Sequence, residues 1–254
     1  MMALRAAKLT DVGLVRRHNE DSLFSDTDLG LFIVADGLGG HAAGEIASQI
    51  VIDRMAEYIR QTASPEATSP VSLDKGLSLN GNRLKAAIHV SDRAIAEDID
   101  IHPERDTMGS TVVACLVEGG RMTVAHVGDS RAYLLDGAGI RQITRDHSWV
   151  AEQVANGILT AEEAKKHPFR NVITQALGNG SGLSVSVREF EISDSQTILL
   201  CSDGLSGMVS DEQILDVCNQ ASNLQDAVEG LVKRAILNGG EDNVSVILVQ
   251  SVQT

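Results

Sequence analysis

The order of strand-like and helical patterns along the chain constrains its fold more than any other feature. Apolar runs predict strands at 29–36 (LGLFIVAD), within 110–144, at 196–204 and at 243–251. Apolar residues at helical spacing predict helices at 45–59, at about 83–98, after Ser210 and from Leu224 to Ile236. Strands and helices are therefore grouped and do not strictly alternate. This grouping predicts an α+β fold and disfavours a doubly wound parallel sheet.

Two segments interrupt this pattern without dividing the chain. Residues 62–82 are rich in Ser, Thr, Pro and Gly and predict a variable surface loop. Residues 147–177 are polar with helical spacing around a break at Pro168, and they predict an insertion between strands. Since neither side of the loop could stand alone, we expect residues 1–254 to form a single domain.

Charge and cysteine usage exclude several classes of protein. The formal net charge is −14, which argues against a general nucleic-acid or membrane-surface binder. The amino-terminal residues lack a signal-peptide pattern, and no apolar run is long enough to span a membrane. Cys115 and Cys201 lie in apolar strand-like runs, which predicts buried free thiols in a reducing compartment, the cytoplasm.

Four aspartates stand at the ends of apolar runs. Asp36, Asp129 and Asp203 close such runs, and Asp242 immediately precedes the closing one. A single Asp in this position is most often a turn residue. Carboxylates that converge at one end of a sheet repel one another, however, unless cations neutralise them, and oxygen ligands suit Mg²⁺ or Mn²⁺. Four such positions favour a metal site.

The glycine-rich stretch VADGLGGH (34–41) is not a typical phosphate loop. An acid opens it, the G-x-G-x-x-G spacing is absent, and the chain contains no G-x-x-x-x-G-K-[ST] motif. The Asp26-Thr27-Asp28 sequence lacks the later Glu of a calcium loop, and we interpret it as a turn.

Taken together, the motifs resemble those of the metal-dependent Ser/Thr protein phosphatases, the protein phosphatase 2C or PPM family, in their compact bacterial form. The similarity extends in order along nearly the whole chain. It is carried by RRHNED (16–21), VADGLGGHAAGEIAS (34–48), DTMGSTVV (106–113), AHVGDSRAYLL (125–135), ITRDHSWV (143–150), HPFRNVITQALG (167–178), LLCSDGLSGMVSDEQI (199–214) and GGEDNVSVILV (239–249). The resemblance implies an α/β/β/α sandwich of two antiparallel sheets flanked by helix pairs, with 147–177 as a flap.

The resemblance also implies a role for each matching residue. Asp36 is expected to bridge two cations, with Asp203 and Asp242 on the first and the Gly37 carbonyl on the second. Glu20 and Asp21 are expected to hold water around the second cation, and Asp129 to join Asp203 around a third. Asn243, like Asp21, is expected just outside the direct ligands. Arg16 is expected to bind the substrate phosphate, and His41 to protonate the leaving oxygen.

These roles imply hydrolysis of phosphoserine and phosphothreonine in proteins by a metal-bridged hydroxide, with two or three Mn²⁺ or Mg²⁺ ions. Such enzymes are expected to act on phosphorylated proteins and to oppose a Ser/Thr kinase in signalling. Two alternatives remain open from the sequence: a weakly active module that binds phosphoproteins, and a phosphatase of small phosphoesters.

Overall fold

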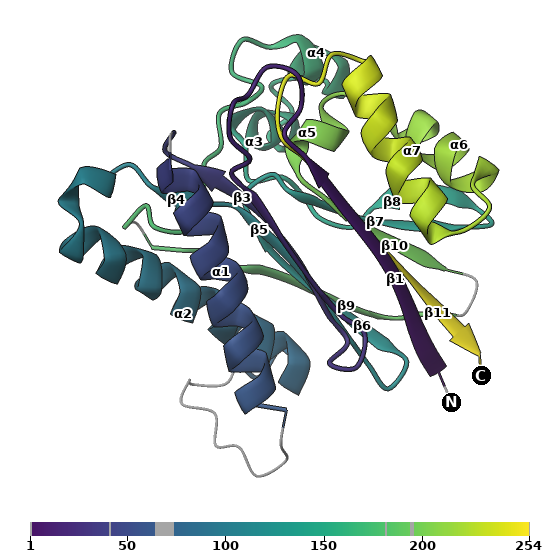
Figure 1. Cartoon of the computed structure of the whole chain (residues 1–254), viewed down its shortest axis with the longest axis horizontal. Helices are drawn as coiled ribbons and strands as arrows, with labels where there is room; N and C mark the ends of the chain where they lie inside the picture. Colours follow the sequence, from purple (N-terminus) through teal and green to yellow (C-terminus); the bar gives the residue numbers. More distant parts are fainter. Residues whose placement is uncertain (1, 41, 64–73, 181, 194–195, 254) are drawn as a thin grey trace.

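The computed structural model describes residues 2–40, 42–63, 74–180, 182–193 and 196–253. Two antiparallel sheets pack face to face, and helices cover both outer faces (Figure 1). The predicted α+β sandwich is therefore confirmed.

The first sheet has the strand order β1-β11-β10-β7-β8. Its strands are β1 (Met2–Asp11), β7 (Arg131–Asp136), β8 (Gly139–Gln142), β10 (Thr197–Cys201) and β11 (Val244–Gln253). The second sheet has the order β2-β3-β5-β6-β9, with β4 paired to β3 beside it. Its strands are β2 (Asp21–Asp26), β3 (Leu31–Leu38), β4 (Gly109–Ser110), β5 (Val112–Glu118), β6 (Arg121–Val127) and β9 (Ser186–Glu191).

Buried apolar side chains form three layers: one between the two sheets, and one between each sheet and the helices that cover it. In β3, Leu31 and Ile33 face the helices, whereas Phe32 and Val34 face the opposite sheet. Side chains on successive strand residues point to opposite faces, so a strand buried on both faces must be apolar throughout. This is why LFIVA is a continuous apolar run.

Two groups of helices cover the sheets. Helices α1 (Ala42–Gln61) and α2 (Leu79–Ile101) pack on the β3 sheet, and the 3-10 helix η1 (Pro103–Arg105) follows α2. Helices α5 (Asp203–Ser206), α6 (Asp211–Gln220) and α7 (Leu224–Leu237) lie on the β11 sheet. The capping box predicted at Ser210 and Gln213 begins α6, so this helix start is confirmed.

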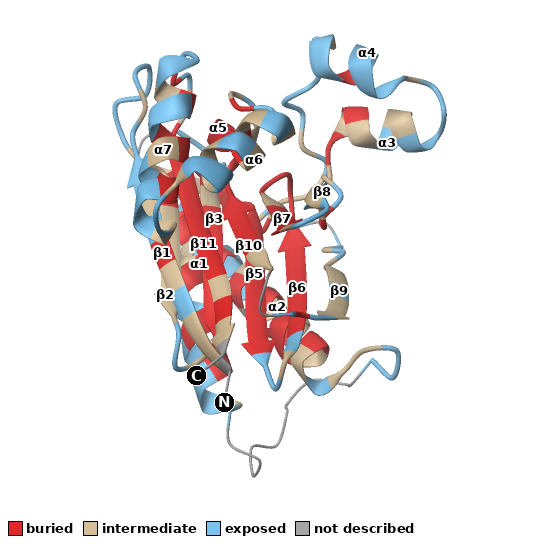
Figure 2. Ribbon diagram, turned by 90° about the vertical axis from the view of Figure 1, so that its right-hand side faces the viewer, coloured by how far each residue is buried: buried red, intermediate tan, exposed pale blue. Residues whose placement is uncertain are grey.

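The insertion at 147–177 contains α3 (Trp149–Ala155) and α4 (Ala161–Lys166), which stand apart from the sandwich (Figure 2). We call residues 147–177 the flap. Helix α4 ends before Pro168, as the break in the sequence pattern indicates.

Strands β1, β2 and β9 were not predicted from the sequence, and α2 begins earlier than predicted. Each of the three strands lies at the edge of its sheet and pairs with one neighbour only. Their half-exposed residues carry polar side chains, so the apolar run that marks a central strand is absent. Helix α2 begins at Leu79 because Ser78 caps it, inside the segment predicted as loop; residues 64–73 of that loop lie outside the described ranges.

Cys115 and Cys201 are buried free thiols, as predicted, and Cys218 is a free thiol of intermediate exposure. Among the described residues, no helix combines the length and apolarity needed to cross a membrane.

Candidate metal centre

The predicted acidic residues meet at one end of the sandwich. Asp36 lies in the last part of β3 opposite Asp21 of β2, and Asp203 is the first residue of α5. Burial raises the pKa of Asp36 well above its usual range, and the charges of Asp21, Asp203, Asp129 and Asp242 raise it further. These carboxylates come from five separate chain segments and share one electrostatic environment.

Backbone contacts fix Asp36 and the glycine after it. The carbonyl of Asp36 accepts hydrogen bonds from Thr111 N at 2.8 Å and from Ser110 Oγ at 3.1 Å. A Cβ at Gly37 would lie 2.0 Å from the carbonyl oxygen of Gly44 in α1. Only glycine therefore lets β3 pass this close to the start of α1.

Arg16 and Asp242 lie side by side, from loops at opposite ends of the chain. Arg16 Nη2 donates to Asp242 Oδ2 at 2.7 Å, and both side chains are partly exposed. The hydrogen bond from Arg16 to Asp242 raises the pKa of Arg16, and the charges of Glu20 and Asp36 contribute as well. The predicted phosphate-binding residue thus stands next to the predicted ligands.

Asn243 holds the loop that carries Arg16. Its Nδ2 donates to the carbonyls of Val12 and His18 at 3.0 Å each, and its Oδ1 accepts from Glu20 N at 2.8 Å. Its side chain is only 5% exposed. One buried amide therefore fixes both ends of residues 12–20.

Asp21 lies in a network of hydroxyl groups that was not predicted from the sequence. Ser202 Oγ donates to Asp21 Oδ2 at 2.8 Å, Ser245 also bonds to this carboxyl, and Thr10 Oγ1 lies 2.8 Å from Ser245 Oγ. Burial raises the pKa of Asp21 to about 7, which the two hydroxyl hydrogen bonds only partly offset. Single Ser and Thr residues within or next to strands carry no sequence signal for such a role.

Asp129 lies on a turn that is joined to the base of the flap. Arg131, two residues later, makes a bidentate ion pair with Asp146, with Nη2 2.7 Å from Oδ2. Burial raises the pKa of Asp129 to about 7, and the charges of Asp203 and Asp146 add to the effect. His147 extends the connection: its Nδ1 accepts from Gly128 N at 3.2 Å.

The carboxylate and carbonyl oxygen atoms of this region are ligands that hard divalent cations prefer, although the side chains do not form a complete binding site without the ion. Over the described ranges, no group of three His, Cys, Asp or Glu side chains is close enough to hold one ion as it stands. Asp36, Asp129 and Asp203 nevertheless all have raised pKa values because they are buried close to other carboxylates. Cations bound among these oxygen atoms would relieve that repulsion.

Nine of the ten predicted site residues belong to the described part of the chain, and all nine lie in this region. The N–H of Gly37 donates to the carbonyl of Glu20 at 3.1 Å. Glu20 lies against α1, where a Cβ on Gly44 would come within 2.9 Å of Glu20 Oε2. His41 lies outside the described residues.

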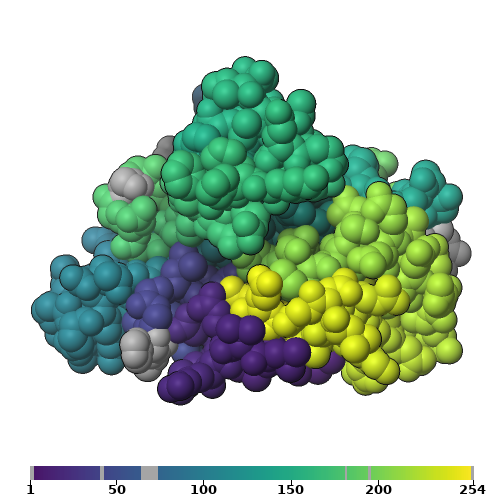
Figure 3. All heavy atoms as spheres, turned by 90° about the horizontal axis from the view of Figure 1, so that it is seen from above, coloured from purple at the N-terminus to yellow at the C-terminus, as the bar shows by residue number. Residues whose placement is uncertain are grey.

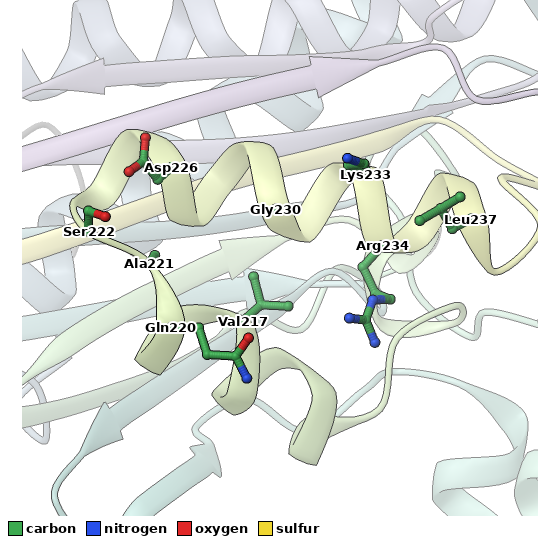
Figure 4. Close-up of a pocket in the computed structure, with 9 residues that line it drawn as sticks. All are labelled: Val217, Gln220, Ala221, Ser222, Asp226, Gly230, Lys233, Arg234 and Leu237. Atoms are coloured by element: carbon green, nitrogen blue, oxygen red, sulfur yellow. The ribbon is translucent and has the colours of Figure 1, made fainter.

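A separate groove between α6 and α7 contains none of these residues (Figure 4). Val217 and Gly230 both line the groove, and a Cβ at Gly230 would be 2.8 Å from Val217 Cγ1, so the helices are in close contact there. The groove follows from helix packing, and the acidic centre lies elsewhere, at the end of the sandwich seen from above in Figure 3.

Comparison with known proteins independently supports the similarity to the protein phosphatase 2C family. The sequence profile described as protein phosphatase 2C matches residues 15–236. The chain is 38% identical over 252 residues to the serine/threonine protein phosphatase PstP of Mycobacterium tuberculosis, covering 99% of this chain and 46% of that protein. It thus spans about half the length of these mycobacterial relatives. It is also 32% identical to the serine/threonine phosphatase stp of Listeria welshimeri, covering 95% of this chain and 93% of stp.

The chain also shares its fold with solved structures of Ser/Thr phosphatases. The crystal structure of M. tuberculosis PstP superposes with a TM-score of 0.88 at 37% identity, covering 99% of this chain and all of that one. The PstP catalytic domain in complex with two manganese ions superposes with a TM-score of 0.85 at 36% identity, covering both chains completely. On the strength of the profile, the relatives and the shared fold, this chain belongs to the protein phosphatase 2C family.

Proposed function

We propose that the chain hydrolyses phosphoserine and phosphothreonine in proteins with the help of Mn²⁺ or Mg²⁺. The observation that carries this proposal is the convergence of five aspartates on one end of the sandwich, with the Arg16 guanidinium beside them. The names of the relatives and the manganese complex of PstP point to the same activity.

In this proposal, each predicted residue keeps the role that its position allows. Asp36, Asp203 and Asp242 would hold one cation. Asp36 and the Gly37 carbonyl would hold a second, with Glu20 and Asp21 acting through water, and Asp129 with Asp203 would hold a third. When bound, the cations lower the pKa of coordinated water and neutralise phosphate charge.

The protein's own groups then orient the substrate. Arg16 is half exposed, and within the described residues its guanidinium donates a single hydrogen bond, to Asp242. The remaining N–H groups are free to bind two phosphate oxygens, a geometry that suits a planar guanidinium. Asn243 keeps this loop in place, and Asp21 lies opposite Asp36 in the pairing of β2 with β3. We assign the role of general acid to His41 from the family resemblance.

Three further proposals concern the extent of the catalytic domain, a kinase partner and the location of the protein in the cell. We propose that residues 1–254 work as one catalytic domain, since the two sheets share an apolar core. We also propose a functional pairing with a Ser/Thr kinase, and a cytoplasmic location, which suits three free thiols.

The deciding experiment measures hydrolysis of p-nitrophenyl phosphate and of a phosphothreonine peptide after chelation, with and without added Mn²⁺. Metal-dependent turnover of both substrates supports the proposal. Turnover of p-nitrophenyl phosphate alone would indicate a phosphatase of small phosphoesters. Peptide binding without turnover would indicate a binding module.

A further inference from the structure

The loop next to the metal centre presents two large aliphatic side chains to solvent. Leu14 is 68% exposed and Val15 is 66% exposed, and Arg16 follows them directly. Removing aliphatic side chains of this size from water is favourable. Two adjacent ones beside a polar site form a small apolar patch, which we call the 14–15 patch.

The exposure of the patch does not come from a loosely held loop. Leu14 N donates to the carbonyl of Gly240 at 2.8 Å, and Gly13 has a left-handed φ of +78°. A Cβ at Gly13 would lie 2.3 Å from the carbonyl oxygen of Asp242, so the loop is in close contact with the segment before β11. The loop is thus fixed by its backbone, while about two-thirds of Leu14 and of Val15 remains exposed.

The position of the patch relative to the site follows from the chain itself. Consecutive Cα atoms are about 3.8 Å apart, so the Cα atoms of Leu14 and Val15 lie within about 8 Å of that of Arg16. Figure 3 shows this purple amino-terminal segment beside the yellow segment that leads into β11, with the green flap on the other side. Residues that flank a phosphate bound by Arg16 are therefore within reach of the patch.

The size of the patch distinguishes between possible occupants. Two such side chains offer on the order of 200 Å² of apolar surface. A stable dimer buries roughly 800 Å² on each partner, so the patch is too small for a second copy of the chain. It matches one or two aliphatic side chains of a bound segment. The net charge of −14 also disfavours an anionic membrane surface.

We propose that Leu14 and Val15 bind an aliphatic side chain next to the phosphorylated residue of a protein substrate, and so contribute to substrate selection. This inference rests on the proposed phosphatase function. The contact persists from the bound substrate through the transition state, so it acts mainly on KM.

The test compares two phosphothreonine peptides that differ only in the residues flanking phosphothreonine, Leu in one and Ser in the other. We expect the unmodified protein to prefer the Leu peptide about tenfold in kcat/KM, which corresponds to about 1.4 kcal/mol. The double variant Leu14→Ser/Val15→Ser should reduce this preference to about twofold or less, mostly by raising KM for the Leu peptide. An unchanged preference in the double variant would overturn the inference.

Leu79→Ser is the matched control. Leu79 is 65% exposed and is the first residue of α2. It lies far from the metal centre, because α1 starts beside that centre and extends for 20 residues, or about 30 Å, toward the end of the molecule where α2 begins. We expect Leu79→Ser to keep the tenfold preference, and loss of the preference in this variant would contradict a local contact. If the double variant fails to unfold cooperatively, the nearly isosteric Val15→Thr replaces it, with an expected two- to threefold drop in preference.

Metal-dependent turnover of p-nitrophenyl phosphate by the unmodified protein separates the two proposals. Its absence would overturn the proposed function. Its presence together with equal kcat/KM for the two peptides would overturn only the role of the 14–15 patch.

Discussion

Arg16 Nη2 lies 2.7 Å from Asp242 Oδ2, although 226 residues separate the two along the chain. The contact joins a predicted phosphate-binding residue to a predicted metal ligand. It also explains how a partly exposed arginine keeps a defined position at the edge of an acidic centre.

Replacement of Arg16 tests phosphate binding. We expect Arg16→Ala to lower kcat/KM for a phosphothreonine peptide about 100-fold, because charge-assisted hydrogen bonds to phosphate are lost. Arg16→Lys should recover only part of this loss, because an ammonium group lacks the planar fork. Steady-state kinetics of the neighbouring Arg17→Ala variant provide the control, and an equal loss there would point to general charge attraction.

Asp36→Asn tests the bridging role. We expect metal-dependent turnover to fall on the order of a thousandfold. Without metal, the variant should nevertheless unfold at a higher temperature than the unmodified protein. Asparagine carries no charge, whereas burial and the neighbouring carboxylates disfavour a charge on Asp36. Thermal unfolding with and without Mn²⁺ measures both effects. The control is Asp28→Asn, an exposed turn residue, and full turnover in Asp36→Asn would contradict the assignment.

Asn243→Ala tests the support of the Arg16 loop. The buried amide serves three backbone groups, those of Val12, His18 and Glu20, so we expect a loss of about 2 kcal/mol in unfolding free energy. The KM for phosphopeptide should also rise, because Arg16 lies in the released loop. Asn238→Ala removes an amide that donates one hydrogen bond, to Met208 O, and should leave KM unchanged. Denaturant titration and kinetics on both variants decide the matter.

His126 makes stability depend on pH. Burial lowers the pKa of His126 to about 4, from the usual 6.5. Its ring stacks on that of His147, with the ring centres 4.6 Å apart, and its Nε2 lies 2.8 Å from the carbonyl oxygen of Arg145. The charge of Asp146 raises the pKa of His126 and that of Arg188 lowers it. The unfolded chain therefore binds the proton more tightly. The stabilising effect is complete above pH 6.5 and declines as the pH falls toward 4, with a total loss of about 3 kcal/mol.

His126→Gln isolates this effect, because a glutamine amide can donate to the same carbonyl without titrating. Between pH 7.5 and 4.5, the unmodified protein should lose about 2–3 kcal/mol more unfolding free energy than the variant. Parallel pH dependence of the two proteins, measured by denaturant titration in chelator, would contradict the lowered pKa.

His41→Ala tests the general acid that the family resemblance implies. The variant should slow hydrolysis of a phosphothreonine peptide more than that of p-nitrophenyl phosphate, because the nitrophenolate leaving group scarcely needs a proton. Measurement of kcat on both substrates is sufficient. An equal loss on the two substrates would argue that His41 has another role.

The sequence by itself determined the central strands, most helices and the identity of the acidic residues. The central strands are apolar on both faces, and that pattern is local, so LFIVA and ILLC could be read directly. The aspartates were found because each one stands directly at the end or just before the start of such a run. The edge strands β1, β2 and β9 escaped prediction because one partner and partial exposure leave a mixed composition.

Only the tertiary structure decided how these residues support one another. The Asn243 amide on the Arg16 loop, the Ser202 and Ser245 hydroxyls on Asp21, and the Arg131–Asp146 pair at the base of the flap join segments that are distant in sequence. Such contacts depend on where packed strands and loops end in space. Local periodicity carries no information about that, so a single Asn or Ser gave no sign of its partner.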